Sequence, residues 1–220
     1  MKAVSRINFS AKNVASTSVT YDNWTSRIRI NVQLPVNYRE GRYLGVLHHE
    51  IGSHFLRRFN EVQQPWHNER KKWGLKSTMT IEEGSGCINM MLEQAADPKK
   101  YTFLFKPALN YYMCCKAYEM SFVEMFKDLE RYVDNPKTRY KYILRVKRGL
   151  ADTSQPGGLY KDQVYLEGAL KLLEHRKEID WQGFYSAKFN IEDLDRKKLM
   201  KKLVKENIVL PKFVEDEKAV

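Results

Sequence analysis

Cysteine is scarce in this chain, with three residues among 220. Cys114 and Cys115 are adjacent and Cys87 stands apart, a set too small and too odd for a disulfide framework. Long hydrophobic runs are also missing. No run approaches the roughly 20 apolar residues of a membrane span, and the first residues lack the apolar core of a signal peptide. These absences favour a cytoplasmic protein that does not enter a membrane.

Acidic residues are outnumbered, with 27 Asp and Glu against 38 Lys and Arg, which gives a net charge of +11. The basic residues are interleaved with acids, and the chain has no arginine-rich arm and no zinc-finger spacing, which argues against nucleic acid as the partner. A basic protein also attracts acidic polypeptides. We therefore expect an acidic polypeptide partner, while the sequence leaves the oligomeric state unknown.

The order of patterns predicts strands first and helices afterwards, in an α+β fold. Residues 27–34 alternate polar and apolar side chains without a break, which is typical of a half-buried strand, and weaker strand signals lie at 5–10 and 16–21. A small antiparallel or mixed N-terminal sheet is expected, followed by a mostly helical region within a single domain over 1–220. Helices are expected over about 39–59, 108–120 and 122–132, in a segment that follows the loop at 149–158 and ends near 175, and over 197–205. A second loop is expected at 60–79.

The segment His49-Glu50-Ile51-Gly52-Ser53-His54 carries the strongest chemical signal. Imidazole is a common zinc ligand, and a carboxylate beside a metal site can act as a general base. At about 100° per residue, a five-residue step in an α-helix separates two side chains by about 140°. A π-type turn would bring the histidines back to within roughly 50°, and Gly52 lies where such a distortion is easiest. The alternative is a polar helix that happens to contain two histidines.

A catalytic zinc needs a third protein ligand. His48, His67 and His175 are weaker candidates than the acidic pair Glu82-Glu83, which opens the next helix and is followed by small residues that permit close packing. Thr80 and Glu83 also have the spacing of a capping box, in which Glu83 would bond to the backbone instead. The spacing alone leaves these two roles of Glu83 equally open.

Several motifs, in the same order, resemble the microtubule-associated tyrosine carboxypeptidase family. The similarity covers roughly residues 27–177, with Ser53 in place of threonine, a stretch before Thr80 that is two residues shorter, and an abbreviated or missing helical segment before the strands. The motifs are His49 to Arg57, Gln64 to Asn68, Thr80 to Gly84, Lys147 to Gly149 with Asp152 to Ser154, and Lys161 to Leu166.

The resemblance implies a zincin-like metallopeptidase with one zinc ion. It assigns His49, His54 and Glu83 as zinc ligands and Glu50 as the catalytic base. Members of the family remove the terminal tyrosine of α-tubulin, and some act on tubulin glutamates. The implied partner is thus the acidic C-terminal tail of tubulin, in microtubules of the cytoskeleton.

A carboxypeptidase also has to bind a free C-terminal carboxylate, for which a cationic side chain is suited. Lys147, Arg148 and Lys161, on either side of the loop at 149–158, are the candidates. Tyr160 and His67 are candidate donors to the oxyanion, and the strand at 27–34 is a candidate edge for the substrate main chain.

Two other functions remain open at this point. The chain is either a zinc peptidase of another specificity, such as an endopeptidase, or a non-catalytic microtubule-binding module that keeps zinc for structure. Glu50 argues against the second, because a structural zinc site has no use for a base and normally has four protein ligands.

Overall fold

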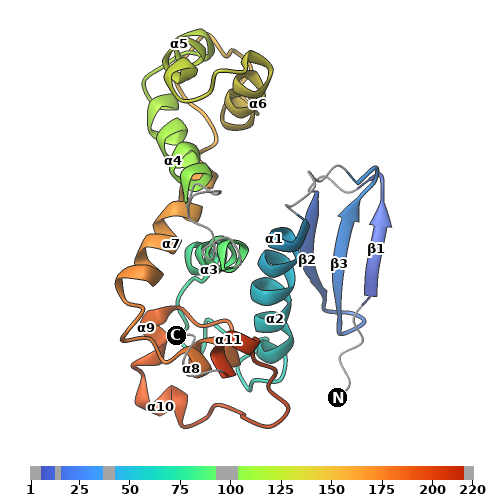
Figure 1. Ribbon diagram of the computed structural model, residues 1–220. Helices are drawn as coiled ribbons and strands as arrows, with labels where there is room; N and C mark the ends of the chain where they lie inside the picture. Colours follow the sequence, from blue (N-terminus) through green and yellow to red (C-terminus); the bar gives the residue numbers. More distant parts are fainter. Residues whose placement is uncertain (1–5, 13–15, 37–42, 93–103, 216–220) are drawn as a thin grey trace.

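The computed structural model describes residues 6–12, 16–36, 43–92 and 104–215, and the architecture is α+β (Figure 1). Three strands come first: β1 (Arg6–Ser10), β2 (Thr17–Asp22) and β3 (Arg27–Gln33). A continuous helical column follows: α1 (Tyr43–Leu47), η1 (His48–Phe55) and α2 (Leu56–Glu61). The later helices are α3 (Met79–Met91), α4 (Phe105–Ala117), α5 (Phe122–Asp128), η3 (Leu129–Arg131), α6 (Pro136–Lys147), η4 (Tyr160–Asp162), α7 (Gln163–Glu174), α8 (Trp181–Ser186), α9 (Ile191–Leu194), α10 (Lys197–Met200) and α11 (Lys212–Glu215).

The sheet is small and mixed, with the strand order β1-β3-β2. The central strand β3 runs parallel to β1 and antiparallel to β2. Its alternation puts Ile28, Ile30 and Val32 on one face, where Ile30 lies opposite Ile7 of β1 and Val19 of β2. Ile28 is fully buried whereas Ile7 is 57% exposed, so this apolar face is covered towards β2 and open towards β1. The mixed sheet predicted from the sequence is confirmed.

The elements that form the centre of the molecule lie side by side in four layers (Figure 1). The sheet packs its β2 edge against the column α1–η1–α2, α3 lies on the other side of that column, and α7 lies beyond α3. Tyr21 of β2 joins the first two layers, because its ring lies edge-on to His67, with centroids 5.0 Å apart, and under the guanidinium of Arg58. This arrangement places the histidine motif between the sheet and α3.

Helices α3 and α7 are in backbone-to-backbone contact at two glycines. A Cβ on Gly168 of α7 would lie 1.9 Å from the carbonyl oxygen of Thr80, and a Cβ on Gly84 would lie 2.2 Å from the carbonyl carbon of Gly168. No side chain larger than hydrogen fits between atoms at such distances. The small residues after the acidic pair therefore permit close packing, but of α3 against α7.

The other helices form two separately packed regions. One lies above the layers in Figure 1 and consists of α4, α5 and α6 around Met113, Met125 and Ile143. Helices α8–α11 cover the lower end, around Phe184 and Phe189. Among the described residues, none of the helices combines the length and the hydropathy that crossing a membrane requires.

The element boundaries differ from the prediction in a few places. The predicted helix 39–59 is the column α1–η1–α2, of which residues 39–42 lie outside the described residues, as does residue 5 of the first strand. The helical segment expected at 197–205 is shorter, because α10 ends at Met200 and turns follow. Ser121 and Glu124 form the capping box that their spacing predicts, and Asn135 caps α6 with Pro136 in its first turn.

The α3–α7 contact predicts a strong effect of a methyl group at Gly168. We expect Gly168→Ala to lower the free energy of unfolding by at least about 3 kcal/mol, because the new Cβ overlaps the Thr80 carbonyl oxygen. In thermal denaturation this corresponds to roughly 6–12 °C in Tm. Leu170→Ala, at an exposed position of the same helix, is the control and should change the free energy by no more than about 0.5 kcal/mol. Equal stability of the two variants would contradict the close contact.

Candidate metal centre

The segment His48–Phe55 is a π-helix, as the five-residue spacing of the histidines predicts. The wider turn brings His49 and His54 to the same side of the column, where their Nε2 atoms are 3.2 Å apart. Gly52 is not among the residues with positive φ, so the π turn does not depend on a conformation reserved for glycine. The histidine pair is therefore positioned by the helix type itself.

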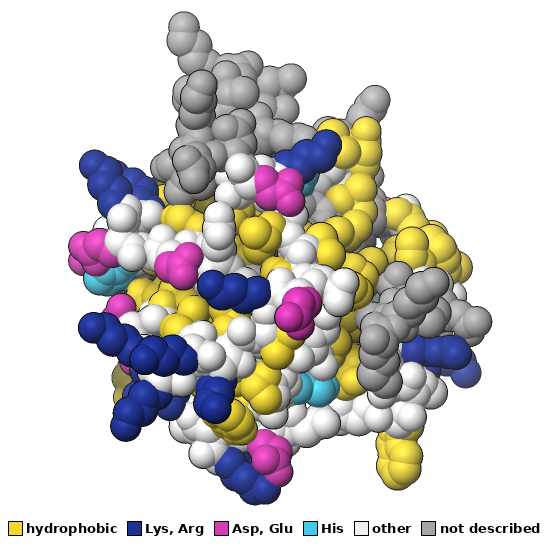
Figure 2. Space-filling model, turned by 90° about the horizontal axis from the view of Figure 1, so that it is seen from below, with side chains coloured by type: hydrophobic (Ala, Val, Ile, Leu, Met, Phe, Trp, Pro, Cys, Tyr) yellow, Lys and Arg dark blue, Asp and Glu magenta, His cyan; other side chains and the backbone are white. Residues whose placement is uncertain are grey.

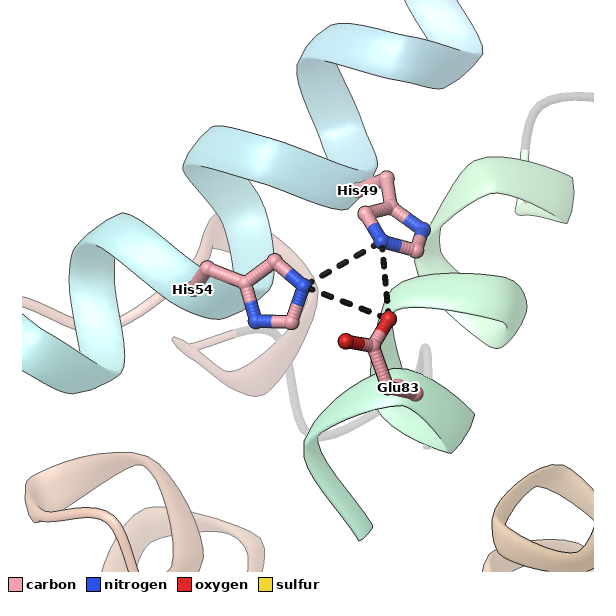
Figure 3. Close-up of side chains that lie close together, drawn as sticks. All are labelled: His49, His54 and Glu83. Carbon is pink, nitrogen blue, oxygen red and sulfur yellow. Dashed lines mark hydrogen bonds and ion pairs between the residues drawn. The ribbon is translucent and has the colours of Figure 1, made fainter. Parts of the chain in front are cut away.

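Glu83 of α3 faces the two histidines (Figure 3). Its Oε2 atom is 3.6 Å from Nε2 of His49 and 3.8 Å from Nε2 of His54. Helix α3 begins at Met79 with Thr78 as the N-cap and without a side-chain cap bond. The capping-box alternative for Thr80 and Glu83 is therefore wrong, because the helix starts earlier than that alternative requires.

The three facing atoms have the spacing expected around one metal ion. Two ligands at 2.0–2.1 Å from a zinc ion in tetrahedral geometry are about 3.3 Å apart. The measured separations of 3.2, 3.6 and 3.8 Å are close to this value. His49, His54 and Glu83 form a group that could hold a metal ion, and two imidazoles with one carboxylate suit zinc.

The ring of His54 is held from behind by Glu82. The Oε2 atom of Glu82 lies 3.2 Å from Nδ1 of His54, so that the other ring nitrogen, Nε2, faces Glu83. Glu82 is itself buried between two cations, at 2.5 Å from Nη1 of Arg57 and 2.7 Å from Nζ of Lys188. Metal sites commonly contain a carboxylate that does not bind the metal itself but orients a ligating imidazole.

The electrostatics of the cluster keep its carboxylates ionised. Burial alone would raise the pKa of Glu82, but Arg57 and Lys188 lower it below the usual range. Burial also opposes ionisation of Glu83, whose pKa is nevertheless lowered by the two histidines that face it. For His54, burial acts to lower the pKa, but the two carboxylates prevail and raise it to about 9. The site thus combines two anions with one imidazole that readily takes up positive charge.

Glu50 lies beside the cluster without belonging to it. Its side chain is on the same π-helix, it is buried, and its Oε2 atom has no hydrogen-bond partner among the described residues. Burial raises the pKa of Glu50, although the nearby histidines act in the opposite direction. A carboxylate with a raised pKa and a free oxygen is suited to accept and return a proton.

Among the described residues, the remaining predicted site residues make no hydrogen bond or ion pair with the cluster. Lys147 is 1% exposed, and its ammonium donates to the carbonyl oxygens of Ala117, Met120 and Gln155. This gives Lys147 a structural role in the loop 149–158, and the proposed contact with a substrate carboxylate is corrected. Arg148 is exposed and donates to the carbonyl oxygen of Arg145 at 2.6 Å.

The other two residues of the predicted substrate site, Tyr160 and Lys161, lie in η4, directly before α7. Tyr160 packs on the α4–α6 region, where the centroid of its ring lies 6.3 Å from that of the Tyr118 ring. Lys161 is exposed. Of the reserve candidates, His67 lies against Tyr21 and is outside the described metal-binding group, and His175 pairs with Glu178 at 3.0 Å.

The expectation that β3 binds a substrate main chain is also corrected. β3 is paired on both sides, with β1 and with β2, so it has no open edge. Only an outer strand has unpaired backbone groups for a peptide to join. The alternation of residues 27–33 was a signal of burial and not of position within the sheet.

Three positions near the site carry functions that sequence reasoning missed. A Cβ on Gly86 would lie 2.5 Å from the ring of His49, so only glycine leaves room for that imidazole. Ser53 accepts a hydrogen bond from Asn89 of α3 at 2.8 Å, which joins the π-helix to α3. Glu82 was recognised as a member of the acidic pair, but nothing in the sequence indicated Lys188 as its partner.

Comparison with known proteins agrees with these features. The family model described as microtubule-associated tyrosine carboxypeptidase matches residues 2–218. The human protein named putative tyrosine carboxypeptidase MATCAP2 is 42% identical over 206 residues, which are 92% of this chain and 38% of that protein. The mouse protein of the same name is 41% identical over the same shares.

A second relative gives the same result. Human microtubule-associated tyrosine carboxypeptidase 1 is 42% identical over 175 residues, which are 78% of this chain and 36% of that protein. The chain thus spans less than two fifths of the length of these relatives. With a family model that matches nearly its whole length, the chain belongs to the microtubule-associated tyrosine carboxypeptidase family.

Proposed function

We propose that this chain is a zinc-dependent metallocarboxypeptidase, a single zincin-like catalytic domain that removes the C-terminal tyrosine from α-tubulin tails. The observation that carries the proposal is the cluster of His49, His54 and Glu83 with the buried carboxylate of Glu50 beside it. The names of the relatives, which are tyrosine carboxypeptidases and in part microtubule-associated, support the substrate.

The donor atoms of the residues determine which role each of them has in the proposed site. His49 and His54 would hold the zinc ion through neutral ring nitrogens and Glu83 through a carboxylate oxygen, which is the number of protein ligands typical of a catalytic zinc. A zinc ion held there would supply Lewis-acid chemistry: it would polarise the scissile carbonyl and lower the pKa of a water molecule to about 7. Glu82 keeps the ring of His54 in the orientation that presents Nε2.

Glu50 moves the proton. Its carboxylate accepts the proton of the attacking water and then gives it to the amine of the released residue. Burial favours this role because it raises the pKa of Glu50 above its usual range, so that the carboxylate takes up a proton more readily. A structural metal site would have no use for this group, which is why the hydrolytic function is preferred to a binding module.

The charge of the surface suits an acidic tail. Figure 2 shows Lys and Arg side chains gathered towards one side of the lower face, the side on which Figure 1 places α10. Lys197, Lys198, Lys201 and Lys202 are exposed in this segment. With a net charge of +11, such a surface raises the rate of encounter with an acidic polypeptide.

Metal content tests the ligand set. We expect the purified protein to bind one zinc ion, and Glu83→Ala to lower its zinc affinity by at least about 100-fold, because one of three ligands is lost. Inductively coupled plasma mass spectrometry after dialysis and competition with a chromophoric chelator measure both values. Glu167→Ala, at an exposed position of α7, is the control. Unchanged affinity in Glu83→Ala would remove Glu83 from the ligand set.

The pH dependence of zinc binding tests the state of His54. Its pKa of about 9 means that the ring is protonated below that pH, and zinc has to displace this proton. We expect zinc affinity to rise with pH between 7 and 9 and to level off above about 9. In Glu82→Gln the ring loses its anionic neighbour, so the levelling should begin at lower pH. Calorimetric titration across this range measures the effect, and an affinity independent of pH from 7 to 9 would contradict it.

Cleavage of a tail peptide tests the activity itself. We expect mass spectrometry to show loss of a single terminal tyrosine from a peptide of the α-tubulin C-terminus, and no loss when a chelator is present. Glu50→Gln should bind zinc normally but cleave about 10²- to 10⁴-fold more slowly, the usual contribution of a general base. Cleavage at internal bonds would favour an endopeptidase instead. Peptide binding without any cleavage would favour the binding module.

A further inference from the structure

Arg145 of α6 is held in a fixed orientation by a buried carboxylate. Its Nε and Nη2 atoms both donate to Asp162 of η4, the second at 3.1 Å, in a bidentate pair. The side chain of Asp162 is 9% exposed, whereas that of Arg145 is 46% exposed. The pair therefore occupies one edge of the guanidinium and leaves the Nη1 group outside it, on a side chain that is about half exposed.

The position of Arg145 follows from the crossing of α3 and α7. Tyr165 lies one turn before Gly168 on α7, and it packs on the cluster that contains Cys87 of α3. Cys87 is one turn after Glu83 on the same helix. Tyr165 also lies one turn after Asp162, the partner of Arg145. Burial and the carboxylate of Glu83 raise the pKa of Tyr165, whereas Arg145 lowers it, so both charged groups act on its hydroxyl. One side chain, that of Tyr165, thus links the metal-binding group to Arg145.

A planar guanidinium fixed by a second carboxylate is suited to bind a further carboxylate. Arginine presents parallel N–H groups that match the two oxygens of such an anion. An orientation fixed in advance lowers the entropy that binding costs. Lys147, one of the cations first considered for this purpose, is fully engaged. Arg145 instead pairs with Asp162, one turn before Tyr165 on the helix that crosses α3.

We propose that Arg145 binds the free α-carboxylate of the substrate's C-terminal residue, with Asp162 and Tyr165 as positioning residues. The inference rests on the proposed carboxypeptidase function and specifies how the substrate's end is recognised. The terminal residue then lies between the metal cluster and α6, with its carboxylate towards Arg145 and its scissile bond towards His49 and His54. Specificity for a chain end follows, because an internal segment has no second anion to offer.

Paired substrates test this assignment. We compare kcat/KM for an α-tubulin tail peptide with a free C-terminus and for the same peptide with a C-terminal amide. The native protein should prefer the free acid. Arg145→Ala should reduce kcat/KM for the free acid on the order of 10- to 100-fold, the range of charge-assisted hydrogen bonds, and leave the amide unchanged. Arg145→Lys, which keeps the charge and the partner Asp162, should retain part of the preference.

Arg131 provides a matched control. It also binds an aspartate and a tyrosine, Asp128 and Tyr112, and it is similarly exposed, but it lies in η3 and has no contact with Asp162 among the described residues. Arg131→Ala should keep the native ratio of the two substrates. The ratio is measured within one preparation, so partial unfolding of a variant does not change it. A ratio equal to the native value in Arg145→Ala would overturn the proposal.

Binding separates this inference from the proposed function. The affinities of both peptides are measured by fluorescence anisotropy with Glu50→Gln, which is expected to retain the substrate, and with Glu50→Gln combined with Arg145→Ala. A preference for the free acid that disappears in the double variant supports Arg145 as the anchor, even if the native protein cleaves neither peptide. In that case only the carboxypeptidase function fails. Equal affinities of the two peptides for Glu50→Gln would reject the anchor.

Discussion

The site depends on one helical segment whose turns are wider than those of an α-helix. Two histidines five residues apart point in different directions in a regular α-helix, and they meet only because His48–Phe55 is π-helical. Such a turn has poorer internal packing than its α-helical counterpart and needs support from its neighbours. Here α3 supplies that support, through the bond from Asn89 to Ser53 and the fit of the His49 ring over Gly86.

A buried charge network stabilises the second histidine. Glu82 sits between His54, Arg57 and Lys188 in a position that is almost closed to solvent. Arg57 in turn donates to the carbonyl oxygens of Ala187 and Phe189, so the network joins η1 and α2 to the segment after α8. Removing one partner from such a network leaves an uncompensated buried charge, which costs several kcal/mol. The orientation of His54 is thus tied to the folding of the C-terminal third.

Local patterns were sufficient for much of the fold and for the centre of the site. The alternation at 27–34 predicted β3, and the spacing of His49 and His54 predicted the π turn. Each of these signals arises from residues that are neighbours in the chain. The role of Glu83, the third member of the cluster, could not be decided from local spacing, because the same spacing fits a metal ligand and a helix cap. Only the resemblance to a family favoured the ligand.

Contacts between distant segments were beyond the sequence. Lys147 is a cation before a loop in the sequence, and only the fold shows that three carbonyl oxygens surround it. β3 has the pattern of a half-buried strand whether it is central or at an edge, so its place in the sheet could not be derived. Lys188 is 106 residues from Glu82, and no periodicity connects them. The pairing of Arg145 with Asp162 is of the same kind.

The two glycines of α3 restrict how the molecule can move. Gly84 lies against the backbone of α7, and Gly86, on another side of the helix, lies against the ring of His49. Helix α3 can neither slide nor rotate without forcing atoms into one of these neighbours, because packed surfaces at such distances do not deform gradually. Helix α3, α7 and the π-helix therefore move as one rigid unit, and any hinge or shear motion of the molecule takes place outside this unit.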